Sequence, residues 1–190
     1  RIQAIGVNFI DIYFRTGLYK ADPPITLGME ASGVVEAVGE GFTQLVPGDR
    51  VAYCMTRGSY AEYAVIPAWQ AIQIPDSLDF ESAAAALLQG MTAHYLTHST
   101  FELKPGHTAL VHAAAGGTGR LIVQLAKMRG ARVIATTSSA AKAEIVRRTG
   151  ADEIVLYTQQ DFQAEAKRLT DGRGVDVVYD SVGASTFDGS

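Results

Sequence analysis

Cysteine is nearly absent from this chain, because Cys54 is the only one among 190 residues. A single thiol excludes an internal disulfide framework, and it also excludes a structural zinc site, which needs four closely spaced thiolates. A reducing, cytoplasmic setting is the simplest interpretation of this composition.

The chain also lacks blocks of like charge and long apolar runs. Charged residues make up 19% of the chain, the net charge is -4, and no block of like charges occurs. The sequence therefore does not indicate a nucleic-acid partner, since such proteins carry a strongly basic surface. The apolar runs are interrupted before they could cross a bilayer, so we expect neither a membrane partner nor a signal peptide.

The chain does contain a strand, a small-residue turn and a helix in close succession. β-formers starting at Thr108 stop at A-A-A-G-G-T-G, and a helical sequence follows from Arg120 to Arg129. The turn fits the dinucleotide-binding pattern G-x-G-x-x-G, with Ala114 in place of its first glycine. In such a turn, the backbone N–H groups and the helix N-terminus bind the pyrophosphate of the dinucleotide. The residues assigned to this contact are Gly116, Gly117, Thr118 and Gly119. The alternative interpretation is a tight turn without a ligand.

The segment after the next predicted strand indicates which dinucleotide is bound. An NAD site carries an acid about twenty residues past the glycines, but this chain has Ser138, Ser139 and then Lys142. Hydroxyl groups and an ammonium would hold a 2′-phosphate that a carboxylate would repel, so the segment favours NADP. The alternative is that one of the serines caps the next helix while Lys142 is a solvated surface charge, and both interpretations can hold together.

The hydrophobic pattern divides the chain into two predicted domains. In residues 1–90 short β-runs alternate with glycine and proline turns, which is typical of a barrel-like or roll-like β domain. Residues 91–190 alternate strands with helices, which predicts an α/β domain with a doubly wound parallel sheet. A helix from Phe80 to Tyr95, with Asp79 as its N-cap, connects the two.

The predicted strands are 1–6, 33–38, 50–54, 60–66 and 71–74 in the first domain, and 108–112, 132–136, 153–157 and 175–179 in the second. Only four strands of a fold that usually has six are present, and the chain begins with Arg1 in the middle of a predicted strand. We therefore expect a fragment that is incomplete at both ends.

Several motifs in the same order resemble the medium-chain dehydrogenase/reductase superfamily. They are N-F-I-D-I-Y-F-R-T-G-L-Y from Asn8, G-M-E-A-S-G-V-V-E-A-V-G from Gly28, G-D-R-V-A-Y from Gly48 and G-S-Y-A-E-Y from Gly58. Within that superfamily, the A-A-A-G-G-T-G turn and the closing Y-D-S-V-G from Tyr179 are similar to the quinone oxidoreductases, the zeta-crystallin-like branch.

The resemblance implies a GroES-like catalytic domain over residues 1–90, a Rossmann NADP-binding domain over residues 91–190, and a homodimer. It also implies a site without metal. Zinc-binding members have a cysteine where this chain has Asn8, and the histidine of G-H-E where it has Met29. The histidines, His94, His98, His107 and His112, lack metal-ligand spacing. Glu30 keeps the family's acid beside the missing histidine, and we expect it to be buried and hydrogen-bonded.

Without a metal, the acceptor of the hydride must not need a strong Lewis acid. Quinones and polarised enones meet this condition, and positioning then supplies much of the rate. The resemblance places Asn8 and Asp11 at the nicotinamide ribose or carboxamide, Tyr13 against the acceptor by a hydrogen bond or by stacking, and Tyr19 in the wall of the substrate cleft. The alternatives are helix capping for Asp11 and ordinary core packing for both tyrosines.

Three more cofactor contacts follow from the resemblance. Tyr95 lies on the connecting helix, which in relatives borders the cofactor, and Tyr157 ends a strand where family members pack an aromatic side chain on the adenine. Ser181 follows the last strand, and ligands of such sheets bind at the carboxyl ends of the strands. The alternative for Tyr95 is a core position.

These observations together predict a cytoplasmic, NADPH-dependent quinone oxidoreductase. An enone, alkenal or enoyl-thioester reductase on the same scaffold stays open, because the sequence shows no acceptor-specific motif. An alternative of another class is a crystallin-like or RNA-binding protein that holds NADPH without turnover, which fold analogy alone does not exclude.

Overall fold

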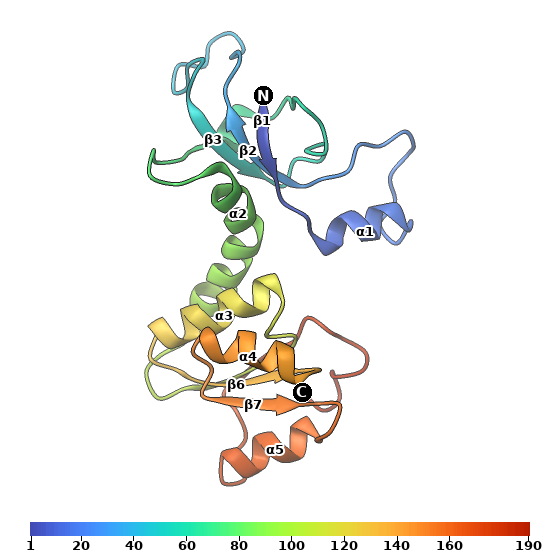
Figure 1. Ribbon diagram of the computed structural model, residues 1–190, viewed down its shortest axis with the longest axis vertical. Helices are drawn as coiled ribbons and strands as arrows, with labels where there is room; N and C mark the ends of the chain where they lie inside the picture. The colour runs from blue at the N-terminus through green and yellow to red at the C-terminus, as the bar shows by residue number, and fades with distance from the viewer. The chain divides into compact units, whose positions relative to one another are not determined.

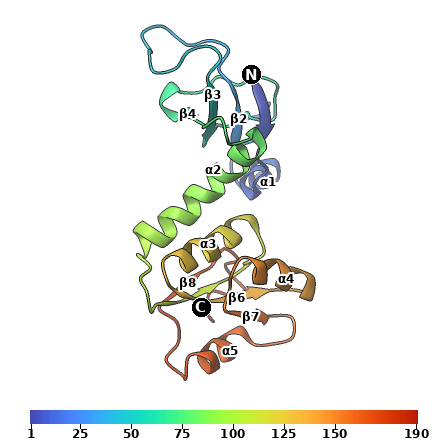
Figure 2. The same ribbon diagram turned by 60° about the vertical axis from the view of Figure 1, so that its left-hand side comes forward.

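The computed structural model describes all of residues 1–190. It divides into two compact units, Arg1–Leu88 (unit 1) and Gln89–Ser190 (unit 2), and Figures 1 and 2 show the elements of each. The helix α2 (Phe80–Tyr95) begins and ends as the sequence predicts, and the Asp79 carboxylate accepts a hydrogen bond from the N–H of Ser82 at 2.6 Å, as expected of an N-cap. A π-helical turn, Leu96–Thr100, follows α2.

Unit 1 is built on a four-stranded antiparallel sheet. Its strands are β1 (Ile2–Ile5), β2 (Glu30–Val34), β3 (Arg50–Cys54) and β4 (Ile72–Gln73), and they pair in that order. A short helix, α1 (Phe9–Arg15), follows β1, and a 3-10 turn, Ala68–Gln70, precedes β4. The β-rich prediction is therefore confirmed, and the bounds of β3 are those predicted.

Two strand predictions in unit 1 need correction. The strand placed at 33–38 lies earlier, at Glu30–Val34, because Glu30 to Val34 pair residue for residue with Cys54 to Arg50 of β3. The strand placed at 60–66 is wrong. That segment makes isolated backbone hydrogen bonds, such as the one from the N–H of Tyr60 to the carbonyl of Leu27 at 3.0 Å, and forms no ladder. A run of β-formers becomes a strand only where a partner strand is in register.

Unit 2 is a doubly wound sheet of four parallel strands. In chain order its elements are β5 (Thr108–Val111), α3 (Gly117–Met128), β6 (Arg132–Thr137), α4 (Ala140–Arg148), β7 (Glu153–Leu156), α5 (Phe162–Leu169) and β8 (Val177–Tyr179). The strand order is β7-β6-β5-β8. After β7 the chain therefore returns to the other side of β5, where β8 pairs with it. The four predicted strands are all present, with ends that differ by two residues or fewer.

Helices cover both faces of this sheet, as Figures 1 and 2 show. On one face, Ile122, Val123 and Ala126 of α3 and Val146 of α4 pack against buried side chains of β5 and β6. On the other face, Phe162 of α5 packs on a small cluster formed by Leu110, Ile134 and Val155. Strands buried on both faces account for the nearly continuous apolar runs in this half of the sequence.

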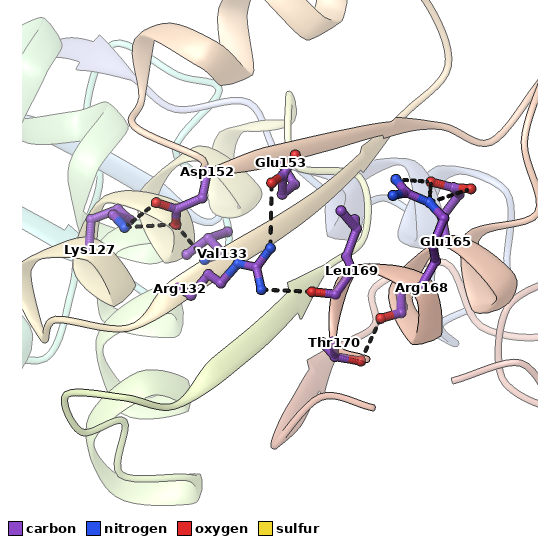
Figure 3. A network of polar contacts seen from close by, with 10 residues as sticks. Lys127, Arg132, Val133, Asp152, Glu153, Glu165, Arg168, Leu169 and Thr170 are labelled. Carbon is purple, nitrogen blue, oxygen red and sulfur yellow. Dashed lines mark hydrogen bonds and ion pairs between the residues drawn. The ribbon is translucent and has the colours of Figure 1, made fainter. Parts of the chain in front are cut away.

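A group of polar contacts lies at the amino-terminal ends of β6 and β7 (Figure 3). The ammonium of Lys127 lies 2.7 Å from an Asp152 carboxylate oxygen, which also accepts a hydrogen bond from the N–H of Val133 at 2.7 Å. Burial by itself would raise the pKa of Asp152, but these two partners outweigh it and hold that pKa below its ordinary value. Arg132 donates to the carbonyl of Leu169 at 2.8 Å, which ties the start of β6 to the end of α5.

Candidate functional site

The turn between β5 and α3 packs closely at its last glycine, Gly119. Ala113 takes a left-handed backbone conformation with φ of 47°, and the N–H of Ala114 donates to the carbonyl of Thr136 at 3.2 Å. A Cβ atom on Gly119 would lie 2.4 Å from the carbonyl oxygen of Ala113 and 2.8 Å from Cα of Ala114. Glycine at position 119 is thus required for the helix to pack this closely on the strand.

The N-terminus of α3 is open to a ligand. The helix begins at Gly117 after Gly116 as N-cap, and no side chain caps it. The first backbone N–H groups of a helix have no intrahelical partner, and their dipole favours an anion. Small residues and an uncapped N-terminus are the features that a dinucleotide pyrophosphate requires, so the turn fits the cofactor that the sequence predicts.

The carboxyl ends of β6 and β7 bring the second group of predicted cofactor residues together. The Thr158 hydroxyl donates to the carbonyl of Ser138 at 3.0 Å, and the N–H of Tyr157 donates to the carbonyl of Thr137 at 3.2 Å. Ser139 is the N-cap of α4, and its hydroxyl accepts a hydrogen bond from the N–H of Lys142 at 3.4 Å. The capping interpretation is therefore confirmed for Ser139. Binding of a 2′-phosphate by the exposed Lys142 side chain stays a prediction.

The segment after β8 is organised by Asp180. Its carboxylate accepts hydrogen bonds from the N–H groups of Val182 and Gly183 at 2.8 and 3.0 Å, and from the hydroxyls of Thr186 and Ser190 at 2.9 and 3.0 Å. Burial would raise the pKa of Asp180, but these donors outweigh it and lower the pKa to about 2. The arrangement fixes the turn that presents the exposed Ser181 just past the sheet. Sequence reasoning gave Asp180 no role, although an Asp before a turn is a known signal for such bonding.

Tyr95 is the predicted cofactor residue with the least structural support. It is the last residue of α2, and half of its side chain is exposed, which argues against the core interpretation. From the same helix, Gln89 lies over the glycine turn, since a Cβ on Gly117 would come 1.8 Å from its side-chain oxygen. Contact of either residue with a cofactor stays a prediction.

Unit 1 collects Asn8, Asp11 and Glu30 into one buried polar network. The Asn8 amide donates to Glu30 at 2.7 Å, and the Asp11 carboxylate accepts from the N–H of Asn8 and from the N–H of Gly28, both at 3.0 Å. Glu30 is completely buried and also accepts from the N–H of Leu88 at 2.6 Å. The expectation that Glu30 is buried and hydrogen-bonded is therefore confirmed.

Burial raises the pKa of Glu30, which the hydrogen bonds from Asn8 and Leu88 only partly offset. Asp11 is 4% exposed, and the reciprocal bonds between Asn8 and Asp11 form a capping box at the start of α1. The capping alternative is thus what the structure shows for Asp11. Contacts of Asn8 and Asp11 with a nicotinamide stay predictions.

Tyr60 completes this network, and sequence reasoning missed it. Its hydroxyl donates to the Asp11 carboxylate at 3.0 Å, across 49 positions of sequence. Burial first, and then the Asp11 carboxylate, raises the pKa of Tyr60 to about 12, so its hydroxyl stays a donor at neutral pH. No short-range pattern could have paired residues so far apart.

The two predicted acceptor tyrosines lie against each other. The rings of Tyr13 and Tyr19 are 5.4 Å apart between centroids, and Phe14 packs edge-on against Tyr19 at 5.6 Å. Tyr13 is partly buried and Tyr19 is 46% exposed, so neither is a fully buried core residue. Their roles toward an acceptor stay predictions.

Metal-ligating side chains are not gathered anywhere in the structure, since no three His, Cys, Asp or Glu residues form a group that could hold an ion. His94 and His98 stack on each other at 4.1 Å between ring centroids. His112 is buried at the end of β5, where its Nδ1 lies 2.8 Å from the Thr136 hydroxyl.

None of the helices combines the length and the apolar character that a membrane span requires.

Comparison with known proteins agrees with this geometry. Residues 1–76 match the alcohol dehydrogenase GroES-like domain, and residues 117–190 match the zinc-binding dehydrogenase family. A quinone oxidoreductase of Pseudomonas aeruginosa is 46% identical over 100% of this chain and 59% of its own length. A 2-haloacrylate reductase of a Burkholderia species is 45% identical over 98% of this chain and 58% of its own length.

Among solved structures, the Escherichia coli quinone oxidoreductase complexed with NADPH superposes with a TM-score of 0.96 at 43% identity, covering 98% of this chain and 58% of that one. An antiparallel GroES-like sheet followed by a doubly wound sheet with a dinucleotide turn defines the class of medium-chain dehydrogenases/reductases. The chain belongs to the quinone oxidoreductase family of that class. It spans about 59% of the length of the Pseudomonas relative.

Proposed function

We propose that the whole protein carrying this chain is an NADPH-dependent, metal-free reductase of quinones. The observation that carries the proposal is the small-residue turn that packs closely on β5 at Gly119 and leads into a helix N-terminus without a side-chain cap. When bound, NADPH supplies the reducing electrons as a hydride from its nicotinamide. The relative of known structure complexed with NADPH supports this choice of cofactor.

In this proposal, unit 2 binds the cofactor and unit 1 presents the acceptor. The N–H groups of the glycine turn hold the pyrophosphate, and Ser138, Ser139 and Lys142 hold the 2′-phosphate. Tyr157 packs on the adenine, while Ser181 and Tyr95 border the cofactor. In unit 1, Asn8 and Asp11 orient the nicotinamide, and Tyr13 and Tyr19 line the acceptor. We also propose a cytoplasmic homodimer, on the family resemblance alone.

Reduction of a conjugated enone or alkenal is the second candidate function. The 2-haloacrylate reductase at 45% identity favours it, because that relative's name specifies a conjugated double bond. Quinones and enones both accept a hydride into a conjugated system, so the same positioning groups serve either acceptor.

Substitution of Lys142 by Glu tests the cofactor assignment. The carboxylate would repel the 2′-phosphate, so we expect the KM for NADPH to rise about tenfold or more, equivalent to about 1.4 kcal/mol, while the KM for NADH changes little. The measurement is steady-state oxidation of each nicotinamide with 1,4-benzoquinone, followed by absorbance.

Lys167→Glu on α5 makes the same charge change at another exposed lysine and serves as the control. Equal loss with both cofactors would remove the 2′-phosphate role from Lys142. Binding of NADPH without any turnover of quinone or enone would instead favour a cofactor-binding protein that is not an enzyme.

A further inference from the structure

An aromatic cluster on and beside α1 is partly exposed to solvent. It consists of Phe9, Tyr13, Phe14 and Tyr19, and successive ring centroids lie 6.4, 5.4 and 5.6 Å apart for the pairs Phe9–Tyr13, Tyr13–Tyr19 and Phe14–Tyr19. Phe9 is 73% exposed. Exposed aromatic rings of this kind offer flat apolar contact to a planar ligand.

A cation borders this aromatic cluster. The guanidinium carbon of Arg57 lies 5.1 Å from the centroid of the Phe14 ring, within the range of a cation–π contact. Arg57 is exposed and takes part in no salt bridge of the structure, so its charge is not neutralised by a carboxylate. A planar guanidinium in this setting keeps its N–H donors for an anion.

Backbone hydrogen bonds on both sides of Arg57 anchor the loop that carries it. The N–H of Met55 donates to the carbonyl of Met29 at 2.8 Å, and the N–H of Gly58 donates to the carbonyl of Gly28 at 2.8 Å. The N–H of the same Gly28 donates to the Asp11 carboxylate at the start of α1. The backbone beside Arg57 and the start of α1 are therefore both tied to one short segment, residues 28–29.

The two acids near residues 28–29 are shielded from solvent, whereas the cation is exposed to it. Asp11 and Glu30 are buried, and their oxygens are occupied by the hydrogen bonds of the polar network. Arg57 is exposed beside the rings. An acceptor that stacks on the aromatic cluster would thus meet a cation and not the two acids.

We propose that Arg57 is a specificity-determining residue that selects conjugated acceptors bearing an anionic group, a carboxylate or a sulfonate. The ring system of the acceptor packs on the aromatic cluster while the guanidinium binds its anion. The inference rests on the proposed reductase function and adds the substrate class to it. The backbone anchors of the Arg57 loop and of α1 reduce the ordering that binding requires.

The test compares two quinones that differ in one charge, 1,4-naphthoquinone and 1,4-naphthoquinone-2-sulfonate, with NADPH and the whole protein. For Arg57→Gln we expect the ratio of the KM for the sulfonate to the KM for the neutral quinone to rise at least tenfold. Arg57→Lys should restore part of this ratio. The control, Arg15→Gln, removes another exposed arginine, at the end of α1, and should leave the ratio unchanged.

Three outcomes would overturn the proposal. One is an equal rise of both KM values in Arg57→Gln, which would show that Arg57 only supports Phe14. Another is the same shift in Arg15→Gln, which would indicate general surface charge. If the unaltered protein reduces neither quinone, the proposed function fails, and equilibrium binding of the sulfonate then decides about Arg57. Equal dissociation constants for the unaltered protein and Arg57→Gln would refute its role.

Discussion

Gly119 shows how much of the cofactor turn depends on a single missing side chain. The left-handed conformation of Ala113 directs its carbonyl oxygen to the space beside Gly119. The sequence pattern predicted the turn, and its third glycine, Gly119, is the one that the fingerprint associates with close packing of helix on strand. The atoms that a side chain at Gly119 would meet belong to residues five and six positions earlier, and only the structure shows their positions.

Gly119→Ala should destabilise the protein by about 1–3 kcal/mol, because the new Cβ meets backbone atoms that cannot move aside. Gly90→Ala is the matched control. Gly90 is a helical glycine of α2 with nothing within 4 Å of a Cβ, so this change should stabilise by about 0.5–1 kcal/mol. Urea unfolding followed by circular dichroism measures both. Equal stabilities of the two variants would refute the steric argument.

At the scale of elements, local sequence and tertiary partners contribute differently. The alanine-rich composition and N-cap of α2 and the β-runs of unit 2 predicted those elements within two residues, since each is specified locally. Residues 60–66 have the composition of a strand but lack a partner in register. The polar network joins residues 17, 22 and 49 positions apart, through Asp11–Gly28, Asn8–Glu30 and Asp11–Tyr60. Such pairs exist only once β1, β2 and α1 are packed.

Glu30 is the completely buried acid of that network and the best place to test it. Glu30→Ala would remove a completely buried carboxylate, together with the hydrogen bonds that it accepts from the Asn8 amide and the N–H of Leu88, so we expect a loss of about 2–4 kcal/mol in the free energy of unfolding. Glu62→Ala removes an exposed carboxylate and should change stability by less than about 0.5 kcal/mol. A loss below about 1 kcal/mol in the free energy of unfolding of Glu30→Ala would contradict this prediction. It would mean that water takes over the hydrogen bonds of the carboxylate.

At the scale of the whole molecule, the predicted site residues fall into two sets that follow the two units. Asn8, Asp11, Tyr13 and Tyr19 lie in unit 1, and the glycine turn, Ser138, Ser139, Lys142, Tyr157 and Ser181 lie at the carboxyl ends of the strands of unit 2. The order of motifs was enough to predict the fold class and the family. It was not enough to predict the acceptor, because side chains that would contact the acceptor, such as Arg57, come from loops without a repeating pattern.

In the proposed function, hydride transfer to the acceptor proceeds without a metal, because the family resemblance places Asn8 and Met29 where zinc-binding members have their ligands. The most direct measurement is the rate of NADPH oxidation by 1,4-benzoquinone with the whole protein, before and after exhaustive dialysis against a chelator, together with its metal content. We expect the same rate in both samples and no stoichiometric zinc. A rate that is lost on dialysis and restored by added zinc would contradict this expectation.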